Sequence, residues 1–288
     1  MKIKAYAKVN LALKVINKRP DNYHNLVTIM DLIDIYDQIY ISKSNIVTLK
    51  CNDKSLENEA NLILKAINIL KKEKPNCQNM GVKIYLKKKI PYGGGLGGGS
   101  SDAAAVLIAL NVLWMLNLSF EELIRIALKV GSDVPFFLLR SLGILSGIGE
   151  NVNAIDSNLK LYYLVVTPGY PLYTKDVYGT NKIYGEDTSK IDNMISGFST
   201  NNINLVINNM FNDLTEAACG INIDEPKIAD IIEEMMAFVK DKNCLAKAIM
   251  SGSGSSVFCA FENKKEALNA YHFFRNKGWK IQLTESVR

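Results

Sequence analysis

The sequence has few cysteines and histidines, and their spacing does not join them into a site. Among 288 residues there are five cysteines and two histidines, and no two cysteines form a C-x-x-C pair. An odd number of thiols without paired spacing argues against a disulfide framework and a zinc centre, and favours a reducing compartment. We therefore expect buried structural thiols and no metal site built from protein side chains. The thiols are Cys51, Cys77, Cys219, Cys244 and Cys259.

Long hydrophobic runs and a large charge excess are absent as well. The longest apolar stretch, residues 103–116, is interrupted by Asn111 and is too short to cross a bilayer. A balance of 34 Lys and Arg against 29 Asp and Glu suits a small acidic substrate but does not indicate nucleic acid. The first residues enter strand-like sequence without a signal segment. We expect a cytoplasmic protein that binds neither membrane nor nucleic acid; no pattern predicts an oligomeric state.

Composition and periodicity predict two α/β domains. Residues 1–50 alternate like strands, and the chain turns polar at 151–158, which predicts an N-terminal domain over 1–155 and a C-terminal domain over 156–288. In the second domain, the order of elements predicts an α+β layer with helices on one face of an antiparallel sheet. The helices that we expect cover 58–74, 120–131, 202–218, 226–240 and 264–277. In the second domain we expect strands over 161–167, 257–261 and 279–286, and a further strand just before the turn at 251–254.

The most distinctive segment is a glycine run at residues 91–102, which holds six of the 19 glycines. It follows the strand-like segment 82–90 and leads into a strong helix former at 103–110. Glycine lets the backbone come close to a ligand, and the N–H groups and dipole of a helix N-terminus then face it. This arrangement predicts a phosphate site.

Three kinds of phosphate-binding loop could account for this run. A Walker A loop needs a lysine after its glycines, and none follows here. A dinucleotide fingerprint is literally present, but its acidic partner, about twenty residues on, would fall on Glu121 or Glu122 in a helix-capping box. The remaining reading is a loop and helix that end in paired hydroxyls, Ser100 and Ser101, which can cap the helix and offer oxygens to phosphate or magnesium.

The run resembles the central ATP loop of the galactokinase, homoserine kinase, mevalonate kinase and phosphomevalonate kinase (GHMP) superfamily. Residues 7–11 with 21–24, residues 131–137 and residues 249–258 resemble, in order, further motifs of one branch of this superfamily. Tyr6 and Asn22 depart from the pattern, since the branch usually has proline and glycine at these positions. Both replacements are locally tolerable.

The resemblance implies a two-domain kinase with an N-terminal domain like ribosomal protein S5, a ferredoxin-like C-terminal domain and the active site between them. It implies that ATP, used with Mg²⁺, phosphorylates the 2-hydroxyl of 4-diphosphocytidyl-2-C-methyl-D-erythritol in the non-mevalonate route to isoprenoids. Two alternatives stay open. One is another GHMP kinase, for homoserine or mevalonate, and the other is a nucleotide-binding protein without catalysis. The resemblance implies that Tyr23 and His24 recognise cytosine, and this favours the cytidyl substrate over homoserine or mevalonate.

Two residues are predicted to carry the chemistry, Lys8 and Asp133. From the residues alone, strand alternation places Lys8 with Asn10 on a polar, solvated face, and Asp133 is typical of a turn or a helix cap. The resemblance implies instead that Asp133 accepts the proton of the substrate hydroxyl while Lys8 pairs with it and polarises that hydroxyl. Asp102 is a rival carboxylate, but helix-dipole compensation accounts for it.

The resemblance also assigns binding residues on both sides of the cleft. The substrate side comprises Asn10, Tyr23, His24, Thr174, Tyr178, Gly252 and Gly254. The ATP side comprises Pro91, Tyr92, Gly93, Gly94, Gly95, Leu96, Gly97, Gly98, Gly99, Ser100, Ser101, Asn61 and Lys88.

Overall fold

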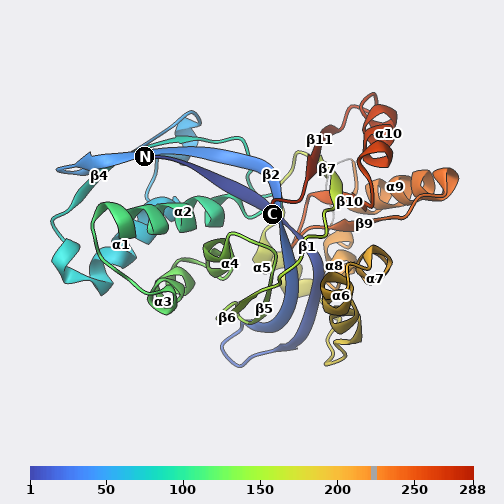
Figure 1. Ribbon diagram of the computed structural model, residues 1–288, viewed down its shortest axis with the longest axis horizontal. Coiled ribbons are helices and arrows are strands. Elements are labelled where there is room, and N and C mark those ends of the chain that lie inside the picture. Colours follow the sequence, from blue (N-terminus) through green and yellow to red (C-terminus); the bar gives the residue numbers. More distant parts are fainter. Residues whose placement is uncertain (222–225) are drawn as a thin grey trace.

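A computed structural model describes residues 1–221 and 226–288, and its strands form two sheets (Figure 1). The strands are β1 (Lys2–Lys18), β2 (His24–Ser44), β3 (Val47–Cys51), β4 (Gly81–Lys87), β5 (Gly143–Gly147), β6 (Asn151–Ala154), β7 (Tyr162–Thr167), β8 (Phe211–Asn212), β9 (Ala246–Met250), β10 (Val257–Phe261) and β11 (Lys280–Glu285). The α-helices are α1 (Leu62–Glu73), α2 (Gly98–Leu113), α3 (Phe120–Val130), α4 (Val134–Leu139), α5 (Thr174–Thr180), α6 (Ser189–Ser199), α7 (Ile203–Asn208), α8 (Thr215–Cys219), α9 (Ile228–Lys242) and α10 (Lys264–Phe274). Short 3₁₀ helices cover Lys54–Leu56 and Pro75–Cys77.

Strands β1 and β2 form a long antiparallel hairpin that runs from the N-terminal half of the molecule into its middle (Figure 1). The turn between them places Asn22 at φ 65°, a left-handed conformation that asparagine tolerates better than most residues. The pairing register shifts at three places along the hairpin, between Tyr6 and Ala7, between Asn10 and Ala12, and between Val15 and Asn17. Such β-bulges bend strands and redirect side chains.

The first sheet has seven strands, with β3-β4-β2-β1-β8 in order and β5 and β6 attached to β2. Helices α1 to α4 cover one face and share a core with the apolar side of the sheet. Helix α3 begins at the capping box that the sequence predicts, in which Ser119 and Glu122 bond each other's backbone N–H groups. Helix α2 is buried along most of its length because it lies between the sheet and its neighbouring helices.

The second sheet is antiparallel, in the order β11-β7-β10-β9, and its two faces pack on different layers. Helices α9 and α10 cover one face, as expected for an α+β layer. The other face, which includes Tyr163 and Phe258, packs on β1 residues such as Val9 and on α6 and α7. The hairpin β1–β2 therefore links the two halves of the molecule, and the chain end returns beside β2 through the pairing of Ile33 with Ser286.

One predicted helix is wrong. The segment 202–218 consists of α7, the short strand β8 and α8 instead of one helix. Strand β8 pairs in parallel with β1, and the side chain of Asn212 donates to the carbonyl oxygens of Met250 and Gly252, both at 2.8 Å. These long-range contacts outweigh the local helical pattern. Since β8 joins the first sheet from the second half of the chain, the boundary at residue 155 stays a prediction.

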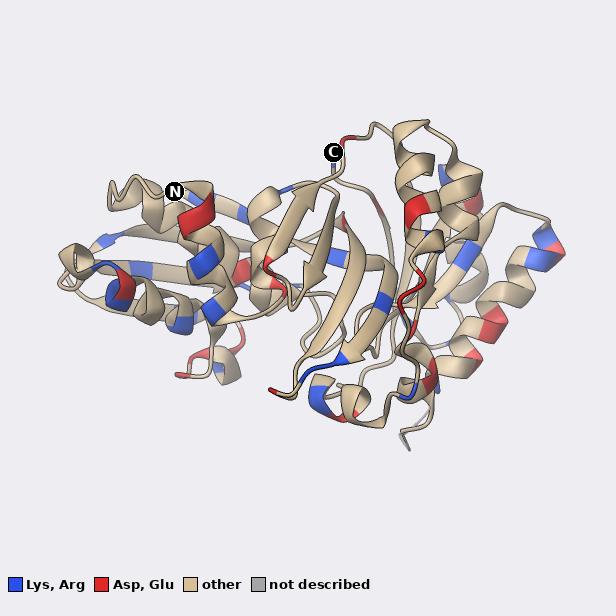
Figure 2. Ribbon diagram, turned by 90° about the horizontal axis from the view of Figure 1, so that it is seen from below, with Lys and Arg blue, Asp and Glu red and all other residues tan. Residues whose placement is uncertain are grey.

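Charges of both signs are interspersed over the ribbon (Figure 2). Within residues 1–221 and 226–288, no helix is long and apolar enough to cross a membrane. All five thiols are free; Cys51, Cys77 and Cys259 are buried and Cys244 is half-buried. Cys219 is exposed, so the expectation of a buried thiol is wrong there, at the end of the short helix α8.

Candidate active site

Lys8, on strand β1 of the central hairpin, faces Asp133, which lies at the start of α4. The Nζ atom of Lys8 lies 3.6 Å from Oδ2 of Asp133, and Lys8 is 2% exposed whereas the Asp133 side chain is 37% exposed. The solvated face expected from alternation does not exist here, because both faces of β1 are covered. Burial lowers the pKa of the Lys8 ammonium, and the charge of Asp133 opposes this shift. A buried cation thus points to a carboxylate that remains accessible to a substrate.

Asn10 holds Lys8 from the other side. Its Oδ1 accepts a hydrogen bond from Lys8 Nζ, while its Nδ2 donates to Thr28 Oγ1 at 2.9 Å. Thr28 in turn donates to the carbonyl of Ala12 at 2.7 Å. Asn10 is 1% exposed, so its amide is oriented by the protein on both sides. Sequence reasoning did not identify Thr28.

The glycine run adopts the conformations that only glycine takes readily. Gly93, Gly95 and Gly97 have φ values of 69°, 73° and 70°. Helix α2 begins at Gly98 with Gly97 as its N-cap, and no side chain caps this end. A helix N-terminus without a side-chain cap offers N–H groups to an anion, as the phosphate-loop prediction requires.

Two glycine motifs that lie about 150 residues apart in the sequence are in direct contact. A Cβ atom at Gly95 would lie 2.1 Å from the carbonyl oxygen of Ser251, and one at Gly252 would lie 3.0 Å from Lys8 Nζ. Ser251 Oγ donates to the Gly95 carbonyl at 3.0 Å, and the Ser256 N–H donates to the Gly94 carbonyl at 3.1 Å. The C-terminal motif therefore packs against the loop and against Lys8.

Lys88 directly follows β4, and its ammonium group lies beside the start of α2, where it is paired with two carboxylates. It binds Asp37 at 2.6 Å and Asp102 at 2.7 Å. Burial raises the pKa of Asp102 to about 8, although Lys88 lowers it, and Asp37 adds a further rise. Asp102 is the fifth residue of α2 and is 2% exposed, so the helix dipole alone does not account for it, as the sequence interpretation supposed. These three groups join β2, the entrance to the loop and α2.

Asn61 caps α1 beside the same helix end. Its Oδ1 accepts from the N–H of Ile63 at 2.9 Å, and its Nδ2 donates to the carbonyl of Leu56 at 2.8 Å. A Cβ atom at Gly99 would lie 3.4 Å from Leu62 Cδ1, in ordinary contact. Asn61 and Lys88 thus flank the first turn of α2, the position predicted for ATP contacts.

Two tyrosine rings, Tyr178 and Tyr184, lie beside His24, and we call these three side chains the aromatic group. The ring centre of His24 lies 4.9 Å from that of Tyr178 and 6.0 Å from that of Tyr184, whose plane differs from it by 9°. Burial lowers the pKa of His24, and the nearby charge of Lys18 lowers it further. His24 Nε2 is buried and has no hydrogen-bond partner among the described residues. Tyr184 was not identified from the sequence, since a lone tyrosine in a polar stretch gives no signal.

The other predicted substrate residues surround this group less closely. Tyr23 is 59% exposed beside His24. Thr174 begins α5, the helix of Tyr178, and its hydroxyl lies 3.0 Å from Ser253 Oγ in the C-terminal glycine motif. Burial raises the pKa of Tyr178, and the charge of Asp133 raises it further. The aromatic group is therefore electrostatically connected to the Lys8–Asp133 pair.

The fold and this site define a class, the GHMP kinases. The sequence matches the family model for the GHMP kinases N terminal domain over residues 61–141 and that for the GHMP kinases C terminal over residues 194–280. A solved phosphomevalonate kinase from Streptococcus pneumoniae covers 100% of this chain and 99% of its own, with a TM-score of 0.74 and 14% identity, and shares the fold. The chain is a kinase, and ATP use follows from this class.

Within that class, the chain belongs to the 4-diphosphocytidyl-2-C-methyl-D-erythritol kinase family. It is 39% identical over 279 residues to the enzyme of that name from Thermoanaerobacter sp. (strain X514), covering 94% of this chain and 91% of the relative. It is 38% identical to the one from Clostridium perfringens (strain SM101 / Type A), covering 96% and 94%. A crystal structure of 4-(cytidine 5'-diphospho)-2C-methyl-D-erythritol kinase matches with a TM-score of 0.80 at 28% identity, covering 100% of both chains.

Proposed function

We propose that this protein transfers the γ-phosphoryl group of ATP to the 2-hydroxyl of 4-diphosphocytidyl-2-C-methyl-D-erythritol, the substrate for which its relatives are named. The observation that carries the proposal is the Lys8–Asp133 pair, 3.6 Å apart beside the glycine loop. Phosphoryl transfer to an alcohol needs the hydroxyl placed in line, its proton accepted and the developing charge stabilised. The site has side chains suited to placing the hydroxyl, to accepting its proton and to stabilising the developing charge.

Asp133 is the proton acceptor in this proposal. The substrate oxygen forms a bond to the γ-phosphorus, the bond from that phosphorus to the β–γ bridging oxygen breaks, and ADP leaves. The hydroxyl proton passes to the accessible Asp133 carboxylate. Lys8, 3.6 Å away, places its ammonium beside this carboxylate and polarises the hydroxyl. Asn10 and Thr28 fix the position of Lys8 through the hydrogen bonds described above.

The glycine loop is the ATP phosphate site. Its left-handed glycines and the N-terminus of α2 without a side-chain cap form a cradle of N–H groups that side chains would fill. Mg²⁺ would enter with the phosphates and neutralise charge on them. That mode of binding needs only one or two protein carboxylates. It fits this chain, whose described residues contain no cluster of three or more His, Cys, Asp or Glu that could hold a metal ion.

The aromatic group at His24 reads the cytosine base. Because its pKa is lowered, the imidazole is neutral at pH 7 and offers one donor and one acceptor. The unpartnered Nε2 is one of these two atoms. Tyr178 and Tyr184 provide ring faces beside it, suited to packing against a planar base. A substrate without a base would leave these groups unused.

The test is an ADP-release assay with ATP, Mg²⁺ and a panel of alcohols that contains the cytidyl compound, homoserine and mevalonate. ADP released with the cytidyl compound alone, and lost in Asp133→Asn, supports the proposal. Turnover of homoserine or mevalonate without turnover of the cytidyl compound would assign another GHMP activity. No ADP from any alcohol, with ATP still bound, would favour a nucleotide-binding protein without catalysis.

A further inference from the structure

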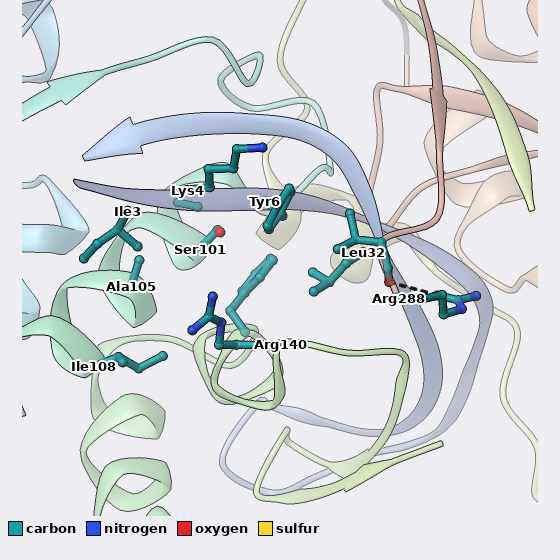
Figure 3. A pocket seen from close by; sticks show the side chains of 12 residues that line it. Ile3, Lys4, Tyr6, Leu32, Ser101, Ala105, Ile108, Arg140 and Arg288 are labelled. Carbon is teal, nitrogen blue, oxygen red and sulfur yellow. Dashed lines mark hydrogen bonds between the residues drawn. The ribbon is translucent and has the colours of Figure 1, made fainter. Parts of the chain in front are cut away.

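A pocket of about 360 Å³ lies behind the glycine loop, bounded by β1, β2, α2, α4 and the residues after β11 (Figure 3). Its floor on α2 is formed by Ser101, Ala105 and Ile108, which share one face of the helix at i, i+4 and i+7. Of the described residues that are predicted to bind ATP, Ser101 alone lines this pocket. The pocket therefore adjoins the predicted phosphate cradle at Ser101 and extends away from the glycines.

The walls of this pocket are largely apolar. Ile3 and Leu32 come from the hairpin, Phe137 from α4 and Val287 from the segment after β11. A volume of this size falls at the lower end of the range for small-molecule sites, which are mostly apolar with a few polar groups. Such walls favour contact with hydrocarbon, because burying apolar surface contributes about 25 cal/mol of free energy for each Å² removed from water.

Two polar groups at the pocket have no partner in the described part of the chain. Ser101 is 2% exposed, its N–H is used by the Gly97 carbonyl, and its hydroxyl makes no hydrogen bond there. Figure 3 shows its oxygen directed from α2 into the pocket. Arg140, which follows α4 at φ 57°, is exposed, lines the pocket and forms no ion pair or hydrogen bond there. A free guanidinium matches phosphate or carboxylate oxygens with its fork of donors.

The other two cations of the pocket are already engaged. Lys4 Nζ lies over the Tyr36 ring, 4.1 Å from its centre. Arg288 donates to Asp31, including one bond of 3.2 Å to Oδ2, and to the carbonyl of Leu159 at 2.9 Å. This leaves Arg140 as the receptor for a negative charge.

We propose that this pocket binds a small amphiphilic anion, with a short hydrocarbon body against the apolar walls and a phosphate or carboxylate head on Arg140 and Ser101. Phe137 connects this site to the glycine loop, because a Cβ atom at Gly97 would lie 2.6 Å from the Phe137 ring. Phe137 is also one turn after Asp133 on α4. The site stands on its own geometry and does not depend on the substrate proposed above.

Calorimetric titration of the full chain tests the proposal, with octyl phosphate and octanoate as probes below their micelle concentrations and saturating ADP on the loop. Octanol supplies the body alone and inorganic phosphate the head alone. We expect one molecule of at least one octyl anion to bind about tenfold or more tightly than either half probe, since both parts of the pocket contribute. Octyl phosphate and octanoate together tell which head the site prefers.

Arg140→Gln should weaken the anion by about tenfold or more, because a charge-assisted contact is lost. Arg125→Gln on α3, also an exposed arginine, is the matched control and should bind like the parent. Ala105→Leu fills the pocket without touching the guanidinium and should abolish binding, which keeps the test decisive if Arg140→Gln unfolds. Unchanged binding in both pocket variants, displacement of the probe by ADP, or equal affinity for octanol would overturn the proposal.

Discussion

The hydroxyl of Ser251 donates a hydrogen bond of 3.0 Å to the carbonyl of Gly95, and the carbonyl oxygen of the same serine lies 2.1 Å from the position that a Cβ atom at Gly95 would take. This contact joins the glycine loop of the first half of the chain to the glycine motif of the second half. It also brings Gly252 against Lys8. The geometry of the loop thus depends on a segment 156 residues away.

Gly95→Ala should disrupt this junction. The new Cβ would stand 2.1 Å from the Ser251 carbonyl oxygen, and the φ of 73° disfavours any side chain. We expect the free energy of unfolding to fall by about 2–4 kcal/mol and the KM for ATP to rise. Gly220→Ala, whose Cβ would meet its nearest atom at 3.5 Å, is the control and should change neither quantity. Urea unfolding and ADP release measure both; parental stability in Gly95→Ala would contradict the contact.

Asp102→Asn should change how stability depends on pH. The pKa of Asp102 is raised from 3.8 to about 8, so between these values the folded protein holds a proton that the unfolded chain has released. Raising the pH across this window therefore destabilises the parent. Asparagine has no proton to lose, so its stability relative to the parent should increase from pH 5 to pH 9. Urea midpoints at pH 5, 7 and 9 measure this, and parallel curves for the two proteins would refute it.

Lys88→Met should be far more damaging than Asp102→Asn. It removes the cation that pairs with both Asp37 and Asp102 and leaves the buried Asp37 carboxylate without this counter-charge. Breaking a buried pair from one side costs about 3–5 kcal/mol. The neighbouring Lys87 is exposed, so Lys87→Met serves as the control and should unfold like the parent. A loss in Lys88→Met no greater than that in Lys87→Met would show that the triad does not stabilise the fold.

Much of the fold could be predicted because its signals are local. The capping box at Ser119 specifies its own conformation, and this prediction is confirmed. Asn22 is a comparable local signal, since asparagine tolerates the left-handed conformation that it takes in the turn. The helix expected at 202–218 failed because Asn212 and β8 are fixed by partners in β1 and after β9, which a local pattern does not register. Alternation likewise predicted a solvated Lys8, because a local pattern does not register that the fold covers both faces of β1.

The candidate site was less visible in the residues themselves. A single lysine, a single aspartate and a single histidine resemble ordinary surface residues until the fold brings them together, and here the motif resemblance supplied their roles. Thr28, Asp37 and Tyr184 lie outside those motifs. Each of them contacts a predicted site residue, and such contacts depend on distances that no sequence spacing encodes.

Asp133→Asn should abolish most turnover while leaving the fold intact. The Asp133 side chain is 37% exposed, so the amide fits at this position, and Lys8 keeps its hydrogen bond to Asn10 when it loses its counter-charge. The amide accepts no proton. General-base removal lowers kcat by about 10²–10⁴-fold. Asp241→Asn, on a side chain that is 69% exposed, is the control and should keep the parental rate. Near-parental kcat in Asp133→Asn, measured by ADP release, would remove Asp133 from the catalytic role.

His24→Gln should separate substrate recognition from ATP binding. The imidazole lies beside Tyr178 and Tyr184, and no contact joins it to the glycine loop among the described residues. We therefore expect the KM for the cytidyl substrate to rise about 10- to 100-fold while the KM for ATP stays constant. His272→Gln, at the exposed histidine of α10, is the matched control. Because burial lowers the pKa of His24 below its ordinary 6.5, the parental KM should be flat from pH 7 to 9 and should rise only in more acidic solution, where the ring gains its second proton. Equal rises in both KM values, or a KM that changes between pH 7 and 9 in the parent but not in the variant, would place His24 outside base recognition by a neutral ring.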